Sequence, residues 1–118
     1  MKKSIHSLSL GLILFTLFAI NNLSAQLVPK TPEEKKAVEF VKAYQAELEM
    51  TVEQASSMYN KIHDNLTLSE EINKSDKPEE EKKKLLLNLD EQETIYMESI
   101  LDAKQFREYK KMKKTLQI

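Results

Sequence analysis

The sequence predicts an all-α protein, a helical hairpin of about four helices, two long and two short. Three observations predict it. The only glycine of the 118 residues is Gly11, so the rest of the chain lacks the residue that tight β-hairpin turns usually require. Apolar residues recur at three- and four-residue spacing through most of residues 37–116, as on one face of a helix. Helix-start signals precede these stripes, and one polar turn divides them into two arms.

Residues 1–25 have the layout of a secretory signal peptide. Lys2 and Lys3 give a basic start, residues 8–20 form an apolar run, and Leu-Ser-Ala at residues 23–25 offers a cleavage site. The apolar run is shorter than the about 20 residues that a membrane-spanning helix needs. We therefore expect residues 26–118 to form one helical domain in the periplasm or outside the cell. An uncleaved membrane anchor is the alternative.

The composition of residues 26–118 narrows the classes of function. Their sixteen basic and nineteen acidic residues give a net charge of −3, which does not favour general nucleic-acid binding. The absence of glycine excludes glycine-rich phosphate loops, and the absence of cysteine excludes both a thiol nucleophile and a stabilising disulfide. Carboxylates are spread along helix faces, and no serine or threonine has a base at a recognisable spacing. The sequence therefore predicts no enzyme and no cofactor, and a thin core that dimerisation would supplement.

The first arm contains two expected helices. Thr31, Pro32 and Glu34 combine a capping hydroxyl, proline at the first helical position and glutamate at the third, which predicts a helix over residues 32–48. A second helix opens after Thr51. Residues 66–70 could form another cap, but their apolar positions stay in phase, so we expect this helix to continue to Ile72.

The second arm follows a polar turn at residues 73–78. Pro78 disfavours helix at the residue before it, and the glutamates at residues 79–81 complement the positive end of a new helix that begins here. A short fourth helix runs from Asp102 to about Leu116. Its polar positions are rich in lysine and arginine, which is typical of a solvated helix end. The alternative is a surface for acidic partners or lipid headgroups. The basic residues are Lys104, Arg107, Lys110, Lys111, Lys113 and Lys114.

A five-residue pattern occurs once in each arm, as Met-Thr-Val-Glu-Gln at residues 50–54 and Leu-Asp-Ala-Lys-Gln at residues 101–105. In each copy a short oxygen-bearing side chain can accept a hydrogen bond from the backbone N–H of the glutamine three residues on. The glutamine side chain can in turn reach back to the backbone N–H of the capping residue. This is a capping box, which starts a helix. Leu101 and Phe106 add a hydrophobic staple to the second copy. Because the copies flank the turn at similar distances, we expect them at the same end of the hairpin. The motif residues are Met50, Thr51, Gln54, Leu101, Asp102, Gln105 and Phe106.

The two motifs together resemble the LTxxQ signature of the Spy/CpxP family of small, helical, periplasmic proteins. Met50 stands for the leucine of the signature, and Asp102 for its threonine with the capping chemistry preserved. The resemblance implies a hooked four-helix hairpin that pairs into cradle-shaped dimers. It also implies an ATP-independent chaperone or an envelope-stress regulator that contacts a sensor kinase; some relatives bind metal. The chain departs from the better-known members in being shorter and net acidic.

The expected function is therefore an exported protein-binding module, a chaperone of unfolded or partly folded envelope proteins that works as a homodimer. The alternatives are a regulatory adaptor for a sensor or membrane partner, with the basic C-terminal helix able to contact a membrane surface, and a metal-handling relative. His63 is the only histidine after residue 25, which makes a metal site a poor prospect unless a dimer pairs two copies. Methionine and tyrosine on the apolar stripes are read as ordinary core, or alternatively as an adaptable surface for clients. The candidate client-binding residues are Met58, Tyr59, Ile62, Tyr96, Met97, Tyr109 and Met112.

Overall fold

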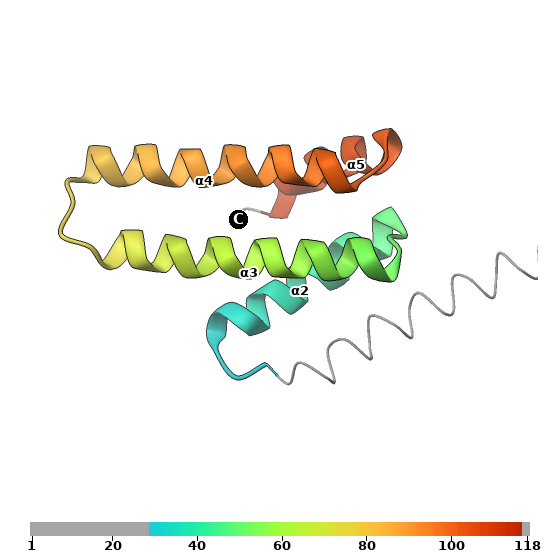
Figure 1. Cartoon of the computed structure of the whole chain (residues 1–118), viewed down its shortest axis with the longest axis horizontal. Coiled ribbons are helices and arrows are strands. Elements are labelled where there is room, and N and C mark those ends of the chain that lie inside the picture. The colour runs from blue at the N-terminus through green and yellow to red at the C-terminus, as the bar shows by residue number, and fades with distance from the viewer. Residues whose placement is uncertain (1–28, 117–118) are drawn as a thin grey trace, which may run out of the picture.

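A computed structural model describes residues 29–116 and contains four helices in this range, with no strand. In chain order they are α2 (Pro32–Leu48), α3 (Val52–Lys74), α4 (Glu79–Ile100) and α5 (Ala103–Leu116), all drawn in Figure 1. The predicted all-α fold is confirmed. The expected signal peptide at residues 1–25 lies outside the described residues.

The long helices α3 and α4 lie side by side and antiparallel, joined by a short turn (Figure 1). The short helices fold back from the other end of this hairpin: α2 packs on α3, α5 packs on α4, and α2 also packs on α5. Each helix thus has two neighbours, and the four close into a ring at the base of the hairpin. We call the end that holds the α2–α3 and α4–α5 junctions the base, and the end at residues 75–78 the tip.

Capping boxes set the starts of α2 and α3. At α2 the Thr31 Oγ1 accepts from the Glu34 N–H at 3.1 Å, and the Glu34 Oε1 accepts from the Thr31 N–H at 3.0 Å. Thr51 and Gln54 repeat this arrangement at α3. Helix α3 continues without a break through residues 66–70 and ends at Lys74, two residues beyond the expected Ile72. The first helix has the predicted bounds, and the third begins at Glu79, directly after Pro78.

The apolar core lies at the base and receives side chains from all four helices. Tyr44 of α2 and Tyr109 of α5 are both fully buried, with their ring centroids 5.1 Å apart. Met58 of α3 and Met97 of α4 are equally inaccessible. Burial of these large side chains is the main driving force that holds the short helices on the hairpin. The core consists of Ala37, Val38, Val41, Tyr44, Leu48, Met50, Ala55, Met58, Tyr59, Ile62, Met97, Leu101 and Tyr109.

Toward the tip the apolar side chains are only partly covered. At 1.5 Å per residue, α2 and α5 are about 25 and 21 Å long, whereas α3 and α4 are each about 33–35 Å. The short helices therefore cannot enclose the whole hairpin. Leu68 of α3 remains 43% exposed and Leu87 of α4 remains 61% exposed. The tip is thus a two-helix ribbon with open apolar surface.

Candidate functional site

The two sequence motifs meet at the base of the hairpin, as predicted, and the contact is made by Gln54 and Gln105, which we call the glutamine pair. The Gln54 Nε2 donates to the Gln105 Oε1 at 2.8 Å, and the Gln105 Nε2 donates back to the Gln54 Oε1 at 3.1 Å. The Gln54 Nε2 also donates to the Ile100 carbonyl, and the Gln105 Nε2 to the Leu48 carbonyl. Each glutamine therefore satisfies the last carbonyl of a helix in the other arm.

Each member of the glutamine pair also completes the capping box of its own helix. The Gln54 Oε1 accepts from the Thr51 N–H at 2.9 Å, and the Gln105 Oε1 accepts from the Asp102 N–H at 3.0 Å. The Thr51 and Asp102 side chains accept in return from the backbone N–H groups of the two glutamines. The motifs are thus helix caps, as their spacing predicts, and the same side chains connect the two arms.

A second clamp closes the junction between α2 and α3. The Gln45 side chain donates to the Met50 carbonyl and accepts from the Met50 N–H, both at 3.1 Å. Between them Glu49 adopts the left-handed conformation, with φ 52° and ψ 52°. The motif's apolar residues Met50 and Leu101 are buried in the core that this sharp junction creates. Phe106 packs against the same core and is half-buried.

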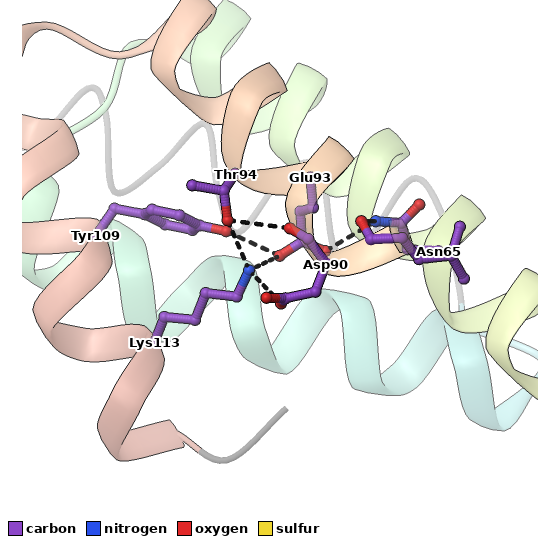
Figure 2. Close-up of polar contacts among 7 residues, drawn as sticks. Asn65, Asp90, Glu93, Thr94, Tyr109 and Lys113 are labelled. Atoms are coloured by element: carbon purple, nitrogen blue, oxygen red, sulfur yellow. Dashed lines mark hydrogen bonds and ion pairs between the residues drawn. The ribbon is translucent and has the colours of Figure 1, made fainter. Parts of the chain in front are cut away.

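Beside the core, a polar network joins α3, α4 and α5 (Figure 2). Its centre is the carboxylate of Glu93, a residue that is only 4% exposed. The Glu93 Oε2 accepts from the Tyr109 hydroxyl at 2.8 Å and lies 3.3 Å from the Lys113 Nζ, while the Oε1 accepts from the Asn65 Nδ2 at 3.1 Å. Lys113 also pairs with Asp90, at 2.6 Å. A buried carboxylate is tolerated because these partners compensate the loss of hydration.

The environment of the network keeps its tyrosines neutral. Burial raises the pKa of the Tyr109 hydroxyl far above its ordinary value, and the neighbouring Glu93 carboxylate adds to the shift. Burial, followed by the same carboxylate, also raises the pKa of Tyr44, whose hydroxyl has no hydrogen-bond partner among the described residues. Both hydroxyls therefore stay protonated near neutral pH. The arrangement is suited to holding α5 against α4.

A groove of about 350 Å³ opens next to the network, between the α3–α4 hairpin and the first turns of α2. Its apolar walls come from two leucines on α4 and from Ile62 and Leu66 on α3, and the buried polar atoms of Asn65 and Glu93 lie at its base end. No residue of α5 lines it. The lining residues are Lys36, Ile62, Asn65, Leu66, Ser69, Glu70, Asn73, Leu86, Leu89, Asp90 and Glu93.

The structure divides the seven candidate client-binding residues into two groups. Five of them are at most 6% exposed and belong to the core: Met58, Tyr59, Ile62, Met97 and Tyr109. In this conformation their side chains are unavailable to a client, apart from the edge of Ile62 in the groove. Tyr96 and Met112 are half-buried at the surface. Among residues 29–116 the exposed large apolar side chains are Leu68 and Leu87 toward the tip and Val52 and Ile95 toward the base, and none of these was a candidate client-binding residue.

Among residues 29–116, His63 lies beside an aromatic ring and one carboxylate. Its ring stacks on Tyr59 with centroids 5.9 Å apart, and its Nδ1 lies 3.8 Å from the Asp64 carboxylate. Within residues 29–116, no three or more histidine, cysteine, aspartate or glutamate side chains gather closely enough to hold a metal ion. Over the same residues, no helix combines the length and the apolar character needed to cross a membrane.

Three residues of this region carry no prediction from the sequence: Gln45, Asn65 and Glu93. Lys113 was expected on a solvated basic helix end, but its side chain is turned inward to Glu93 and Asp90. A signal for two of the three does exist. Glu93 lies four residues from both Leu89 and Met97, and Asn65 lies three from Ile62, so both occupy the buried face of their helices. A polar residue in phase with an apolar stripe predicts a buried polar contact.

No protein-family model, curated protein or solved structure matches this chain. A proposal for the function therefore depends on three features of the structure. They are the hydrogen-bonded glutamine pair at the base, the buried polar network, and the apolar groove beside that network.

Proposed function

We propose that this chain is a non-enzymatic protein-binding module, an ATP-independent chaperone of envelope proteins similar to the Spy/CpxP family. The observation that carries the proposal is the apolar groove beside the tip of a rigidly fixed hairpin. Its three leucines are only partly buried, and partly exposed aliphatic side chains in a hollow next to a packed core are a candidate surface for another molecule. The polar side chains at the base end of the groove are engaged with one another and with Tyr109 and Lys113, which supports a structural role for them.

The groove's chemistry indicates which clients it would hold. Ile62, Leu66, Leu86 and Leu89 provide an aliphatic wall for apolar segments. The charged lining residues contribute little net charge, because Glu93 and Asp90 both pair with Lys113 and Glu70 pairs with Lys74. Apolar segments would therefore bind mainly through burial against the aliphatic wall.

The glutamine pair supports this function indirectly. A holding surface has to stay open while a client binds, and that requires the short helices to remain fixed at the base. The hydrogen bonds of the glutamine pair and the Glu93–Lys113 contact would hold the short helices in place. No residue of α5 lines the groove, so these contacts leave it open. In this proposal the two motifs hold the helices in place, and the leucines of the groove bind the client.

The test is suppression of aggregation of a chemically denatured client, followed by light scattering without ATP. Leu66→Gln with Leu86→Gln should weaken suppression at least several-fold, because both side chains line the groove. Leu87→Gln is the matched control, since Leu87 is a neighbouring leucine of α4 that does not line it. Circular dichroism would verify that both variants remain helical.

The possible outcomes separate the proposals. Absence of suppression by the wild-type protein at several-fold excess would refute the chaperone function. Equal loss in Leu87→Gln would place the client on the outer face of α4 instead of the groove. A single saturable partner in a pull-down, with no general suppression, would favour the regulatory adaptor.

A further inference from the structure

The charges of this protein are separated between α5 and the remaining helices. Helix α5 carries six basic residues and one acidic residue, a net charge of +5. Residues 29–102 carry ten basic and eighteen acidic residues, a net charge of −8. The overall charge near zero therefore conceals one strongly cationic helix on an anionic body.

The cations of α5 face away from the core. Tyr109 is fully buried and the Lys113 side chain is 14% exposed, and together they mark the side of α5 that faces α4. Because successive residues turn by about 100°, the other five basic residues fall on the opposite side, along about 15 Å of helix. All five are exposed. We call them the basic arc: Lys104, Arg107, Lys110, Lys111 and Lys114.

Acidic groups lie close to two members of the basic arc, Lys104 and Lys111. Lys104 lines a hollow together with four acidic residues: Glu47, Glu49, Asp102 and Glu108. The Lys111 Nζ is 3.6 Å from a Glu108 carboxylate oxygen, and Glu47 of α2 lines a hollow together with Lys111 on the same flank of the helix. Lys110 instead lies over an aromatic ring, with its Nζ 4.6 Å from the centre of Phe106. The carboxylates thus occupy one flank, and the outward side of the helix remains cationic.

The basic arc lacks the features of a protein-binding surface. Stable protein interfaces depend on a few aromatic or aliphatic anchors that become fully buried. Among residues 29–116 the exposed large apolar side chains are Val52, Leu68, Leu87 and Ile95, and none belongs to α5. A row of long cationic side chains without an anchor fits a diffuse anionic surface, where each lysine or arginine contributes through Coulomb attraction alone.

We infer that the basic arc docks this protein on the anionic phospholipid headgroups of a membrane surface. Residues 29–102 are net anionic and are repelled by such a surface, so among the described helices α5 is the one directed toward it. The groove is lined by α2, α3 and α4, and it stays free when α5 is in contact with lipid. This inference goes beyond the proposed client binding and does not depend on it.

The test is flotation with phosphatidylcholine vesicles that contain about 30% phosphatidylglycerol, at low and high salt. The protein is taken as recovered after export, and its N-terminus is read by mass spectrometry. Vesicles of pure phosphatidylcholine report any binding by the apolar run of residues 8–20, which needs no lipid charge. We expect binding to the anionic vesicles above this background, and loss of the difference at about 0.5 M salt, where screening shortens the range of the attraction.

Neutralising part of the arc tests the assignment of residues. Each lysine or arginine near an anionic surface contributes about a fivefold gain in partitioning, so the triple variant should bind about a hundredfold more weakly. This variant is Arg107→Gln with Lys110→Gln and Lys111→Gln. The matched control changes the net charge equally at three exposed lysines of α2 and α4, and it should retain binding to within a few-fold: Lys35→Gln with Lys83→Gln and Lys84→Gln.

Three results would overturn the inference. The first is no binding to anionic vesicles at low salt, and the second is an equal loss in the control variant. The third is binding to double-stranded DNA or to polyglutamate as tight as to the vesicles, which would make the arc a general polyanion surface. None of these results bears on aggregation suppression, so failure here is distinguishable from failure of the chaperone proposal.

Discussion

Truncation of Gln105 to alanine provides the most direct test of how the base of the hairpin is held. The Gln105→Ala change removes four hydrogen bonds at once. Two are the mutual bonds with Gln54, one is the bond to the Leu48 carbonyl, and one is the capping bond from the Asp102 N–H. The change leaves the apolar core untouched, so any loss of stability reports these bonds.

The expected loss is a large fraction of the stability of a domain of this size. A hydrogen bond contributes about 0.5–1.5 kcal/mol net, and bonds such as these, which are only partly buried, fall in the lower part of that range. The four together give about 2–4 kcal/mol. At about 0.05–0.15 kcal/mol per residue, residues 26–118 would have a total stability of about 5–14 kcal/mol. The melting temperature should fall by about 10–25 °C.

Urea unfolding followed by circular dichroism at 222 nm measures this loss. The matched control is Glu34→Ala, because Glu34 occupies the same position in the capping box of α2 but makes no contact with the other arm. A cap alone contributes about 1 kcal/mol, and the control should lose no more than that. If Gln105→Ala and Glu34→Ala lose equal stability, the cross-arm bonds contribute nothing measurable and the reasoning is wrong.

A double-mutant cycle isolates the coupling within the glutamine pair. The double variant with Gln54→Ala and Gln105→Ala should lose about 1–2 kcal/mol less than the sum of the single changes, because either change alone already breaks the mutual bonds. Additivity to within about 0.5 kcal/mol would show that the two side chains do not act together.

Further changes test the junction and the polar network. Glu49→Gly should raise the free energy of unfolding in urea by about 0.5–1 kcal/mol, because glycine adopts the left-handed conformation without steric cost. The control Glu47→Gly, within α2, should lower the free energy of unfolding by about 1 kcal/mol. Tyr109→Phe should cost about 1.5–3 kcal/mol, since it removes a bond to the buried Glu93 carboxylate. Tyr44→Phe should be neutral or slightly stabilising, since that hydroxyl has no hydrogen-bond partner among residues 29–116, and equal losses in the two variants would contradict this distinction. The raised pKa values of both tyrosines contribute stability that is complete below about pH 10 and is lost as the pH rises further, so phenolate absorbance from these two residues should appear only together with loss of helicity.

The helices could be predicted from the sequence because their ends depend on local chemistry. Thr31, Pro32 and Glu34 act within one turn, and the structure places the first helix at the predicted residues. The same holds for Thr51 and for Pro78, whose effects reach only a few residues along the chain. The predicted end of α3 is two residues too early, because the last turn of a helix depends weakly on any single side chain.

The sites could be predicted only in part. The sequence identified the motif residues and their capping role, but it could not show that Gln54 and Gln105 bond to each other across 51 positions. Lys113 was grouped with the exposed basic residues of the last helix, yet its side chain is turned inward to Glu93 and Asp90. Which lysine of a basic helix faces inward depends on how that helix is rotated against its neighbours, and one sequence does not define this rotation.

By itself the sequence determined that this chain is helical, where its helices begin and where the two long helices turn back on each other, because capping, proline geometry and apolar periodicity act over a few residues. Only the tertiary structure decided that the two capping glutamines pair, and that most of the methionines and tyrosines are core. It also decided which apolar side chains remain open, among them the leucines that line the groove toward the tip. These outcomes depend on contacts between segments far apart in the chain, whose formation is governed by packing that no local pattern encodes.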